Sequence, residues 1–166
     1  AYGWWKITTG KVDFQYTGLA QNAGGWWYIH NGAVDFGYTG FGQNGNSWWY
    51  CRGGKVQFDD NGVIEGTVNG TYGWWKVVNS QVIFDNDVCA NASGWWKITN
   101  GQVDFGFNGL AQNEYGWWYV SGGKIDFAYT GLAQNENGWW YVRNGKVDFT
   151  FSDDLLINGK IYRVIR

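Results

Sequence analysis

Seven Trp-Trp pairs recur along this chain at a nearly constant spacing, and that period limits the fold more than any other feature. The pairs stand at positions 4–5, 26–27, 48–49, 74–75, 95–96, 117–118 and 139–140. Successive pairs are therefore 22, 22, 26, 21, 22 and 22 residues apart. A period of about 20 to 50 residues is typical of repeat proteins, in which each unit is one small supersecondary element that shares a core with its neighbours. The spacing predicts such an array.

Each repeat has the pattern of a β-hairpin. A unit reads Gly-Trp-Trp-Tyr-Val-x-Asn-Gly-Lys-Val-Asp-Phe. Asn-Gly between two β-prone runs favours a type I′ turn, because both central residues of that turn need positive φ. The chain is 21% aromatic, contains 27 Gly and lacks Pro, which fits hairpins better than helices. The predicted turns are Thr9-Gly10, Asn31-Gly32, Gly53-Gly54, Asn79-Ser80, Asn100-Gly101, Gly122-Gly123 and Asn144-Gly145. The first and the fourth of these fit the turn pattern least well.

A two-residue turn sets which residues face each other across the hairpin. Around the second turn, Ile29 faces Val34 and Trp27 faces Phe36. We therefore predict that the second Trp of every pair is a core residue that packs on a Phe and is backed by an aliphatic pair. The same register predicts the pairs Trp5 with Phe14, Trp49 with Phe58, Trp75 with Phe84, Trp96 with Phe105, Trp118 with Phe127 and Trp140 with Phe149. A lone hairpin of this length is marginally stable, so the repeats must stack.

The other face of each hairpin carries the first Trp, then Tyr or Lys, and then Asp. Rigid rings beside carboxylates and amides suit a sugar, whose C–H face stacks on a ring while its hydroxyls form hydrogen bonds. The candidate carbohydrate-binding residues are Trp26, Tyr28, Asp35, Tyr38, Trp48, Tyr50, Trp117, Tyr119, Asp126, Tyr129, Trp139 and Tyr141. The alternative is that the first Trp packs against the connector of the next repeat and leaves no exposed platform.

Two further expectations concern polar residues near this face. The Tyr-Thr-Gly-Leu-Ala-Gln-Asn connectors are expected to place amides at loop positions, namely Gln43, Asn44, Gln134 and Asn135. In repeats one and five Lys replaces the Tyr, and exposed cross-strand ion pairs are expected between Lys6 and Asp13 and between Lys97 and Asp104.

A second symmetry lies above the hairpin repeat, because residues 1–58 match residues 92–149 at a constant offset of 91. We predict an all-β, solenoid-like fold of two duplicated three-repeat blocks joined by a divergent fourth repeat. The expected divisions are a first block over 1–70, the divergent repeat over 71–91 and a second block over 92–166, together forming one bilobal module. The stretch 153–166 is expected to form a C-terminal capping hairpin around Asn158-Gly159.

Charge and hydropathy exclude several partners. The formal net charge is −2, and the 12 Lys and Arg are spread along the chain, whereas a nucleic-acid partner requires a basic patch. No apolar run approaches the roughly 18 residues of a membrane span, so no membrane insertion is expected. The chain starts in mid-repeat, which indicates part of a larger multidomain protein, and we expect a monomer.

Catalysis is not expected. A glycoside hydrolase needs a unique pair of carboxylates, whereas the Asp residues here recur in register, and His30 is the single His. No cofactor and no metal site are predicted, because two Cys and one His give no metal-ligand spacing. Cys51 and Cys89 either form a disulfide or remain as two buried thiols.

The repeat unit, followed by Tyr-Thr-Gly-Leu-Ala-Gln-Asn, resembles the repeats of extracellular amylases and starch-adherence proteins of gut bacteria. More distantly, it is similar to the choline-binding and glucan-binding cell-wall repeats. The resemblance implies an extracellular or surface-attached bacterial module that binds a polysaccharide without catalysis, with an α-1,4-glucan such as starch favoured. The alternatives are attachment to the cell wall through choline or peptidoglycan, and a structural or protein-docking spacer.

Overall fold

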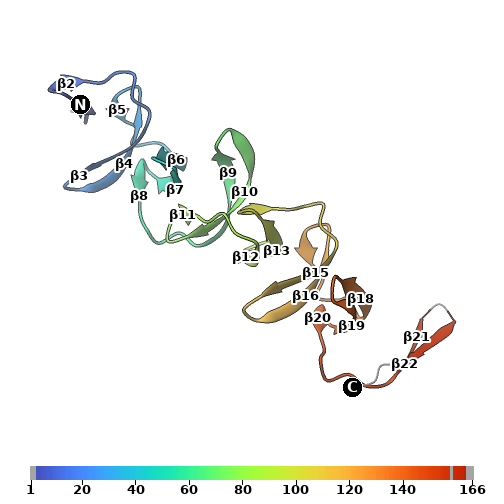
Figure 1. Cartoon of the computed structure of the whole chain (residues 1–166). Coiled ribbons are helices and arrows are strands. Elements are labelled where there is room, and N and C mark those ends of the chain that lie inside the picture. Colours follow the sequence, from blue (N-terminus) through green and yellow to red (C-terminus); the bar gives the residue numbers. More distant parts are fainter. Residues whose placement is uncertain (1–2, 158, 164–166) are drawn as a thin grey trace.

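The computed structural model describes residues 3–157 and 159–163, and all regular secondary structure within them is β-strand (Figure 1). From the second repeat on, each Trp-Trp pair lies in a long strand. These strands are β4 (Gly25–His30), β7 (Ser47–Arg52), β10 (Thr71–Val78), β13 (Gly94–Thr99), β16 (Gly116–Ser121) and β19 (Gly138–Arg143). Each pairs with the short strand that follows it: β5 (Ala33–Val34), β8 (Lys55–Val56), β11 (Gln81–Val82), β14 (Gln102–Val103), β17 (Lys124–Ile125) and β20 (Lys146–Val147). In the first repeat the hairpin is β1 (Ile7–Thr8) with β2 (Lys11–Val12). The predicted hairpin repeats are thus confirmed.

The two-residue turns also lie where the sequence predicts them, including the two with the weakest pattern. Thr9 has φ of 49°, Asn79 has φ of 49° and Ser80 has φ of 67°. Positive φ at both central residues is what a type I′ turn requires. The register is as predicted, with Ile29 opposite Val34 and Cys51 opposite Val56.

The connectors differ from the sequence-based expectation, because they form strands. Those strands are β3 (Gly18–Asn22), β6 (Gly40–Asn44), β9 (Gly62–Val68), β12 (Asp87–Asn91), β15 (Gly109–Asn113) and β18 (Gly131–Asn135), and each pairs with the Trp-Trp strand after it. Gln43, Asn44, Gln134 and Asn135 are therefore strand residues. The Leu and Ala of the connector are apolar enough to be buried, as at Leu19 (2% exposed). The turn that follows is closed by an Asn side chain, since the Gly24 N–H donates to Asn22 Oδ1 at 2.8 Å.

Successive repeats interlock through the second residue of each hairpin turn. The Tyr28 N–H donates to Gly54 O at 2.8 Å, and the Gly54 N–H donates to Tyr38 O at 2.7 Å. A Cβ on Gly54 would lie 2.2 Å from Asp35 O, so only Gly fits without displacement. In the fourth repeat Ser80 takes this place; it is fully buried, and its hydroxyl donates to Asp60 Oδ2 at 2.8 Å.

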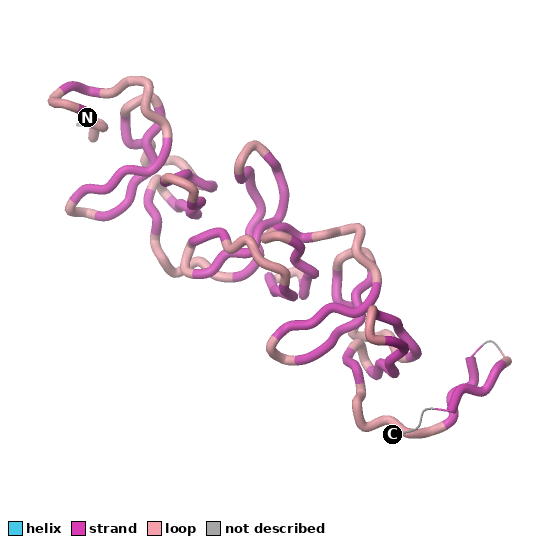
Figure 2. Tube along the Cα trace, in the orientation of Figure 1, coloured by secondary structure: helices cyan, strands magenta, loops and turns pink. Residues whose placement is uncertain are grey.

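The interlocked repeats form an elongated array whose hairpins project in different directions, with the first and last repeats at opposite ends (Figures 1 and 2). Neighbouring repeats are joined by single-residue strand pairings, such as Trp27 with Lys55 and Trp118 with Lys146. This arrangement is the solenoid-like fold predicted from the spacing.

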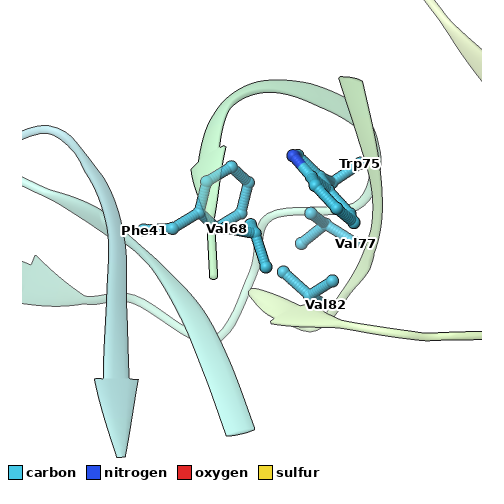
Figure 3. Packing of buried hydrophobic residues seen from close by; sticks show 5 residues of the cluster. All are labelled: Phe41, Val68, Trp75, Val77 and Val82. Atoms are coloured by element: carbon cyan, nitrogen blue, oxygen red, sulfur yellow. The ribbon is translucent and has the colours of Figure 1, made fainter. Parts of the chain in front are cut away.

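The fourth repeat is longer than the others, which explains the spacing of 26. Strands β9 and β10 form seven residue pairs, whereas β3 and β4 form five. The two additional pairs extend the hairpin to a turn at Asn69-Gly70. Val68, at the end of this extension, packs with Phe41 of β6, Trp75 and Val77 of β10, and Val82 of β11 (Figure 3). The expected boundary between residues 70 and 71 falls on this turn, and the division into blocks stays a prediction.

All seven predicted Trp–Phe pairs are present as edge-on ring contacts, with centroids 5.5–6.1 Å apart. The second Trp is buried, as predicted, at Trp75, Trp96 and Trp118, but Trp5 is 49% exposed, so the prediction is wrong there. The Phe rings are not core residues either. Phe58 is 46% exposed and Phe14 is 64% exposed, and the other five lie between these values. The reason is local: the Phe follows the end of the short strand, where the chain turns away, as shown by the Tyr38 N–H donating to Asp35 O.

The two expected ion pairs are not formed between the described residues. The Lys6 ammonium instead lies 5.5 Å from the centre of the Tyr16 ring, and the Lys97 ammonium lies 5.7 Å from the centre of the Phe107 ring. An ammonium held near an aromatic face gains a cation–π interaction in place of the exposed ion pair.

Both cysteines are free thiols, so the disulfide alternative is wrong for this structure. Cys51 occupies the predicted aliphatic position opposite Val56 and is fully buried. Burial raises the pKa of its thiol to about 12.

The C-terminal hairpin consists of β21 (Asp154–Ile157) and β22 (Lys160–Arg163). These strands pair with each other in a separate two-stranded sheet, and Leu156 and Ile161 are 74% and 71% exposed. Asn158 of the predicted turn lies outside the described residues.

Candidate binding sites between repeats

We call the packed region between two successive repeats a joint. The first Trp of a pair points into the joint with the next repeat. Trp26 packs against the cluster formed by Leu19 of its own repeat and by Cys51 and Val56 of the next one. Trp48, Trp74, Trp95 and Trp117 are likewise half-buried, and each packs against one of the apolar clusters between repeats. Trp139 of the last repeat differs, because it is 65% exposed. In repeats two to six the first Trp therefore packs against the next repeat, as the alternative interpretation held, whereas Trp4 contacts Trp27 and Phe36 but is 43% exposed.

Every joint contains the same three aromatic residues, which we call a triad: the first Trp of one repeat, and the second Trp and the Phe of the next. The six triads are Trp4/Trp27/Phe36, Trp26/Trp49/Phe58, Trp48/Trp75/Phe84, Trp74/Trp96/Phe105, Trp95/Trp118/Phe127 and Trp117/Trp140/Phe149.

Three triads are closed, because the first Trp contacts both of the other rings. In the first joint the Trp4 ring lies 4.9 Å from the Trp27 ring and 5.4 Å from the Phe36 ring, nearly perpendicular to each. Triads Trp74/Trp96/Phe105 and Trp95/Trp118/Phe127 have the same contacts. Trp4 and Trp27 also line a cavity of about 250 Å³ beside Lys6, but Phe36 is not among its lining residues.

The other three triads are open, because a cavity separates the rings. Triad Trp26/Trp49/Phe58 lines a cavity of about 100 Å³, and triad Trp117/Trp140/Phe149 lines one of about 220 Å³. The largest of the three cavities, about 480 Å³, is lined by triad Trp48/Trp75/Phe84. In each of these three triads all three rings line one cavity, and within the described residues the first Trp has no ring contact to the next repeat.

The closed and open joints follow the sequence duplication. The two smaller open triads are equivalent at the offset of 91 residues, and so are the closed triads that contain Trp4 and Trp95. Each block thus repeats the same order, a closed joint followed by an open one. The triad Trp48/Trp75/Phe84 belongs to the divergent fourth repeat and has no such equivalent.

The two tryptophans of a pair also differ in their indole N–H groups. In four repeats the second Trp donates to a connector Asn, as Trp140 Nε1 does to Asn135 Oδ1 at 2.8 Å. Within the described part of the chain, no first Trp donates its indole N–H to a protein acceptor, and none of these groups is buried without a partner. The second Trp is therefore anchored, and the first keeps a free donor at the joint.

A lysine of the next repeat covers the second Trp in three repeats. Lys55, Lys124 and Lys146 each place their ammonium 5.2 Å from the centre of the Trp ring with which their backbone pairs, namely Trp27, Trp96 and Trp118. Gln81 and Gln102 stand at this position beside Trp49 and Trp75. The rings of Trp27, Trp96 and Trp118 therefore already contact a Lys ammonium group.

The tyrosines of the predicted site stack on one another inside the joints. The Tyr28 and Tyr38 rings are 3.5 Å apart, the Tyr119 and Tyr129 rings are 3.7 Å apart, and Tyr141 stacks on Phe151 at 3.8 Å. The Tyr38 hydroxyl donates to Phe41 O at 2.8 Å, and burial together with the neighbouring Tyr28 raises the pKa of Tyr38. Tyr50 lies against Phe41, with ring centroids 5.3 Å apart.

The predicted carboxylates form turns. Asp35 Oδ1 accepts the Gly37 N–H and Asp126 Oδ1 accepts the Ala128 N–H, both at 2.9 Å. Such hydrogen bonds to the backbone two residues on stabilise the bend at the end of the hairpin. The structure therefore brings Trp26, Tyr28 and Tyr38 together in one joint, and Trp117, Tyr119 and Tyr129 in another. The assignment of these residues to ligand binding stays a prediction.

The described residues contain no cluster of three or more potential metal ligands. No helix in the described part of the chain is long and apolar enough to cross a membrane.

Comparison with known families gives one match. The choline-binding repeat family matches residues 15–35, 37–57, 85–104, 106–126 and 128–148, which together cover more than half of the chain. The chain therefore belongs to the choline-binding repeat family, a family of binding modules. A comparison with curated proteins found no significant match. The more distant of the two resemblances is thus confirmed, and the resemblance to amylase-associated repeats stays a prediction.

Proposed function

We propose that this chain is a cell-wall attachment module that binds a quaternary ammonium group, such as choline, at its two duplicated open joints. The observation that carries the proposal is the cavity of about 220 Å³ between Trp117, Trp140 and Phe149. Family membership supports choline as the ligand.

The chemistry of this joint suits a quaternary ammonium. Such a cation has no N–H to donate and binds best to the electron-rich faces of aromatic rings. The cavity is lined by the three rings, by Leu110 and Val147, and by two Asn residues, with no charged side chain among the lining residues. A cation that needs no hydrogen bonds can enter this cavity at little desolvation cost, whereas a well-hydrated ammonium cannot.

Duplication of the joint supports attachment to a polymer. The equivalent triad Trp26/Trp49/Phe58 lies 91 residues earlier and lines its own cavity. Two weak sites on one elongated array engage two groups of the same polymer, and avidity then exceeds the affinity of either site. A bacterial cell-wall polymer that carries choline presents such repeated groups, which places the module at the cell surface.

The test is titration with choline, followed by Trp fluorescence and calorimetry. The double variant Trp26→Leu with Trp117→Leu removes one ring from each duplicated open triad and keeps an apolar side chain. We expect it to weaken choline binding about tenfold or more, since a desolvated cation–π contact contributes about 2 kcal/mol.

The matched control is Trp4→Leu with Trp95→Leu, which makes the same change in the two closed triads and should leave choline affinity unchanged. Equal loss in both double variants, or no saturable choline binding by the unaltered chain, would contradict the proposal. Binding that is as tight for ethanolamine as for choline would also contradict it.

An α-glucan ligand on the first-Trp face is the second candidate, and it is favoured by the exposed ring of Trp139. The other first tryptophans between repeats are partly covered by the following hairpin, which leaves less flat surface for a starch chain. Sedimentation with insoluble starch tests this candidate, with Trp139→Ala as the variant that should lose binding. Retention of Trp139→Ala on starch at the level of the unaltered chain would contradict it.

A further inference from the structure

We propose that the cavity of the divergent fourth repeat is a binding site for a neutral oligosaccharide, distinct from the choline sites of the two duplicated joints. The proposal does not rest on the proposed function, because it concerns a different cavity with a different lining. At about 480 Å³ this cavity lies within the range of about 300–1,000 Å³ typical of ligand sites, and the other two open joints lie below it.

The cavity has an aromatic floor. The exposure of its three rings increases from Trp75, which is buried, through Trp48, which is half-buried, to Phe84, which is 47% exposed. The Trp75 and Phe84 rings meet edge-on at 6.1 Å. A pyranose presents flat C–H faces, and indole rings are the side chains that best cover such faces while losing little conformational freedom.

The rim is formed by amides from three successive repeats. Asn46 lies in the turn between β6 and β7, Asn69 in the turn between β9 and β10, and Asn100 in the turn between β13 and β14. Within the described residues, none of these three side chains forms a hydrogen bond to the protein, and all three residues are exposed. Each amide can both donate and accept, which matches sugar hydroxyls that do the same.

The additional length of the fourth hairpin creates this rim. The two extra residue pairs of β9 and β10 carry Asn69 and Thr71 beyond the ends of the shorter hairpins, where they line the cavity with Gln43 of the preceding repeat. Hairpins of ordinary length, as in the duplicated joints, leave a smaller and more apolar cavity. The insertion that breaks the spacing of the repeats is thus also the element that enlarges the site.

The cavity is uncharged. No Asp, Glu, Lys, Arg or His is among its lining residues. At the position where Lys124 and Lys146 cover a Trp in later repeats, Gln102 pairs with Trp75. Its equivalent in the first block is Lys11. An uncharged site with many hydrogen-bond donors and acceptors favours a neutral sugar, whose hydroxyls pair with the amides, whereas a quaternary ammonium has no N–H and would leave them unpaired.

Gln102→Lys is the test variant, because the fold already accepts Lys at this position in the next two repeats. The new side chain is expected to lie over Trp75 as Lys146 lies over Trp118, and so to cover the aromatic floor. The probes are maltohexaose, cellohexaose and chitohexaose at millimolar concentration, followed by Trp fluorescence and calorimetry. At least one should bind saturably to the unaltered chain, and Gln102→Lys should weaken it about tenfold or more.

The matched control is Gln81→Lys, the same change one repeat earlier, beside Trp49 and outside the cavity. It should bind the sugar as the unaltered chain does. The proposal is overturned if none of the three sugars binds, if Gln102→Lys binds as the unaltered chain does, or if the two variants lose affinity equally. Choline titration of the same samples separates the two proposals, since Gln102→Lys should keep choline binding and the Trp26→Leu, Trp117→Leu variant should keep sugar binding.

Discussion

At the scale of single residues, equivalent positions in the repeats hold chemically different side chains for identifiable reasons. The aliphatic position opposite the short strand is Val120 or Val142 in later repeats and Cys51 in the third. Packing accepts a thiol there because Cys is small and behaves as an apolar residue when buried. Its burial makes the thiolate unfavourable, which is why the pKa is raised to about 12.

This raised pKa predicts a loss of stability at alkaline pH. The ordinary pKa of the thiol is 9.0, so below pH 9 it is protonated in both states and the folded state keeps its full stability. Above pH 9 the unfolded chain ionises and the folded chain does not, so the free energy of unfolding should fall by about 1.4 kcal/mol for each pH unit until about pH 12. Denaturant unfolding between pH 8 and 10 measures the slope. Cys51→Val, which copies the later repeats, should make the slope shallower without removing it, because burial also raises the pKa of the Cys89 thiol. An equally steep slope in that variant would show that another group is responsible.

At the scale of the element, the hairpin turn has two structural tasks, and the sequence pattern alone does not distinguish them. It reverses the chain, and its second residue also connects to the previous repeat through the Gly54 hydrogen bonds to Tyr28 and Tyr38. The first task needs only positive φ, whereas at Gly54 the second also leaves no room for a side chain. In the fourth repeat Ser80 takes this place, and its hydroxyl donates to Asp60.

Two glycines separate these tasks. Gly54 and Gly45 both have positive φ, but a Cβ on Gly45 would meet nothing within 4 Å, whereas one on Gly54 would meet Asp35 O at 2.2 Å. Gly45→Ala should cost about 1–2 kcal/mol of unfolding free energy from backbone strain alone. Gly54→Ala should cost about 3 kcal/mol or more, because the repeats must also move apart. Urea unfolding of the two variants checks the difference, and equal costs would show that the contact between repeats contributes little.

At the scale of the whole molecule, contacts run between neighbouring repeats, so stability should depend on how many joints are kept. The C-terminal hairpin pairs only with itself within the described residues, and its Leu156 and Ile161 are exposed. The seventh repeat, by contrast, buries Ala133, Val142 and Val147 against Leu110 of the sixth.

Shortening the chain from this end should therefore have two different effects. A chain that ends at residue 152 should unfold within about 1 °C of the full chain, since no joint is lost. A chain that ends at residue 130 loses one joint and should unfold several degrees lower, because 1 kcal/mol shifts the midpoint of a domain of this size by about 2–4 °C. Thermal unfolding followed by circular dichroism measures both, and a large shift on removal of residues 153–166 would show that the C-terminal hairpin caps the array.

The sequence by itself determined the features that are local. Turn residues such as Asn31-Gly32 set the register within a hairpin, so all seven Trp–Phe pairs and the position of Cys51 could be predicted. The connector strands were not predicted. Most of their turns are closed by an Asn side chain, at Asn22 for example, whereas the fourth repeat closes this hairpin with Asn69-Gly70 at positive φ. That the two Trp residues of a pair have different surroundings could be predicted, but where Trp26 and Trp117 point could not, and their predicted role in binding stays a prediction.

Only the tertiary structure decided which joints are open, and the reason is that a joint is shared by two hairpins. Trp95 and Trp117 occupy the same sequence position, yet one contacts the rings of the next repeat and the other borders a cavity. The packing of one hairpin against the next depends on contacts at the turn glycine and on the length of the hairpins. Both involve two repeats, so the sequence pattern of a single repeat does not determine them. The repeat spacing determined that a Trp stands at every joint, and the packing between repeats decided which of these joints has room for a ligand.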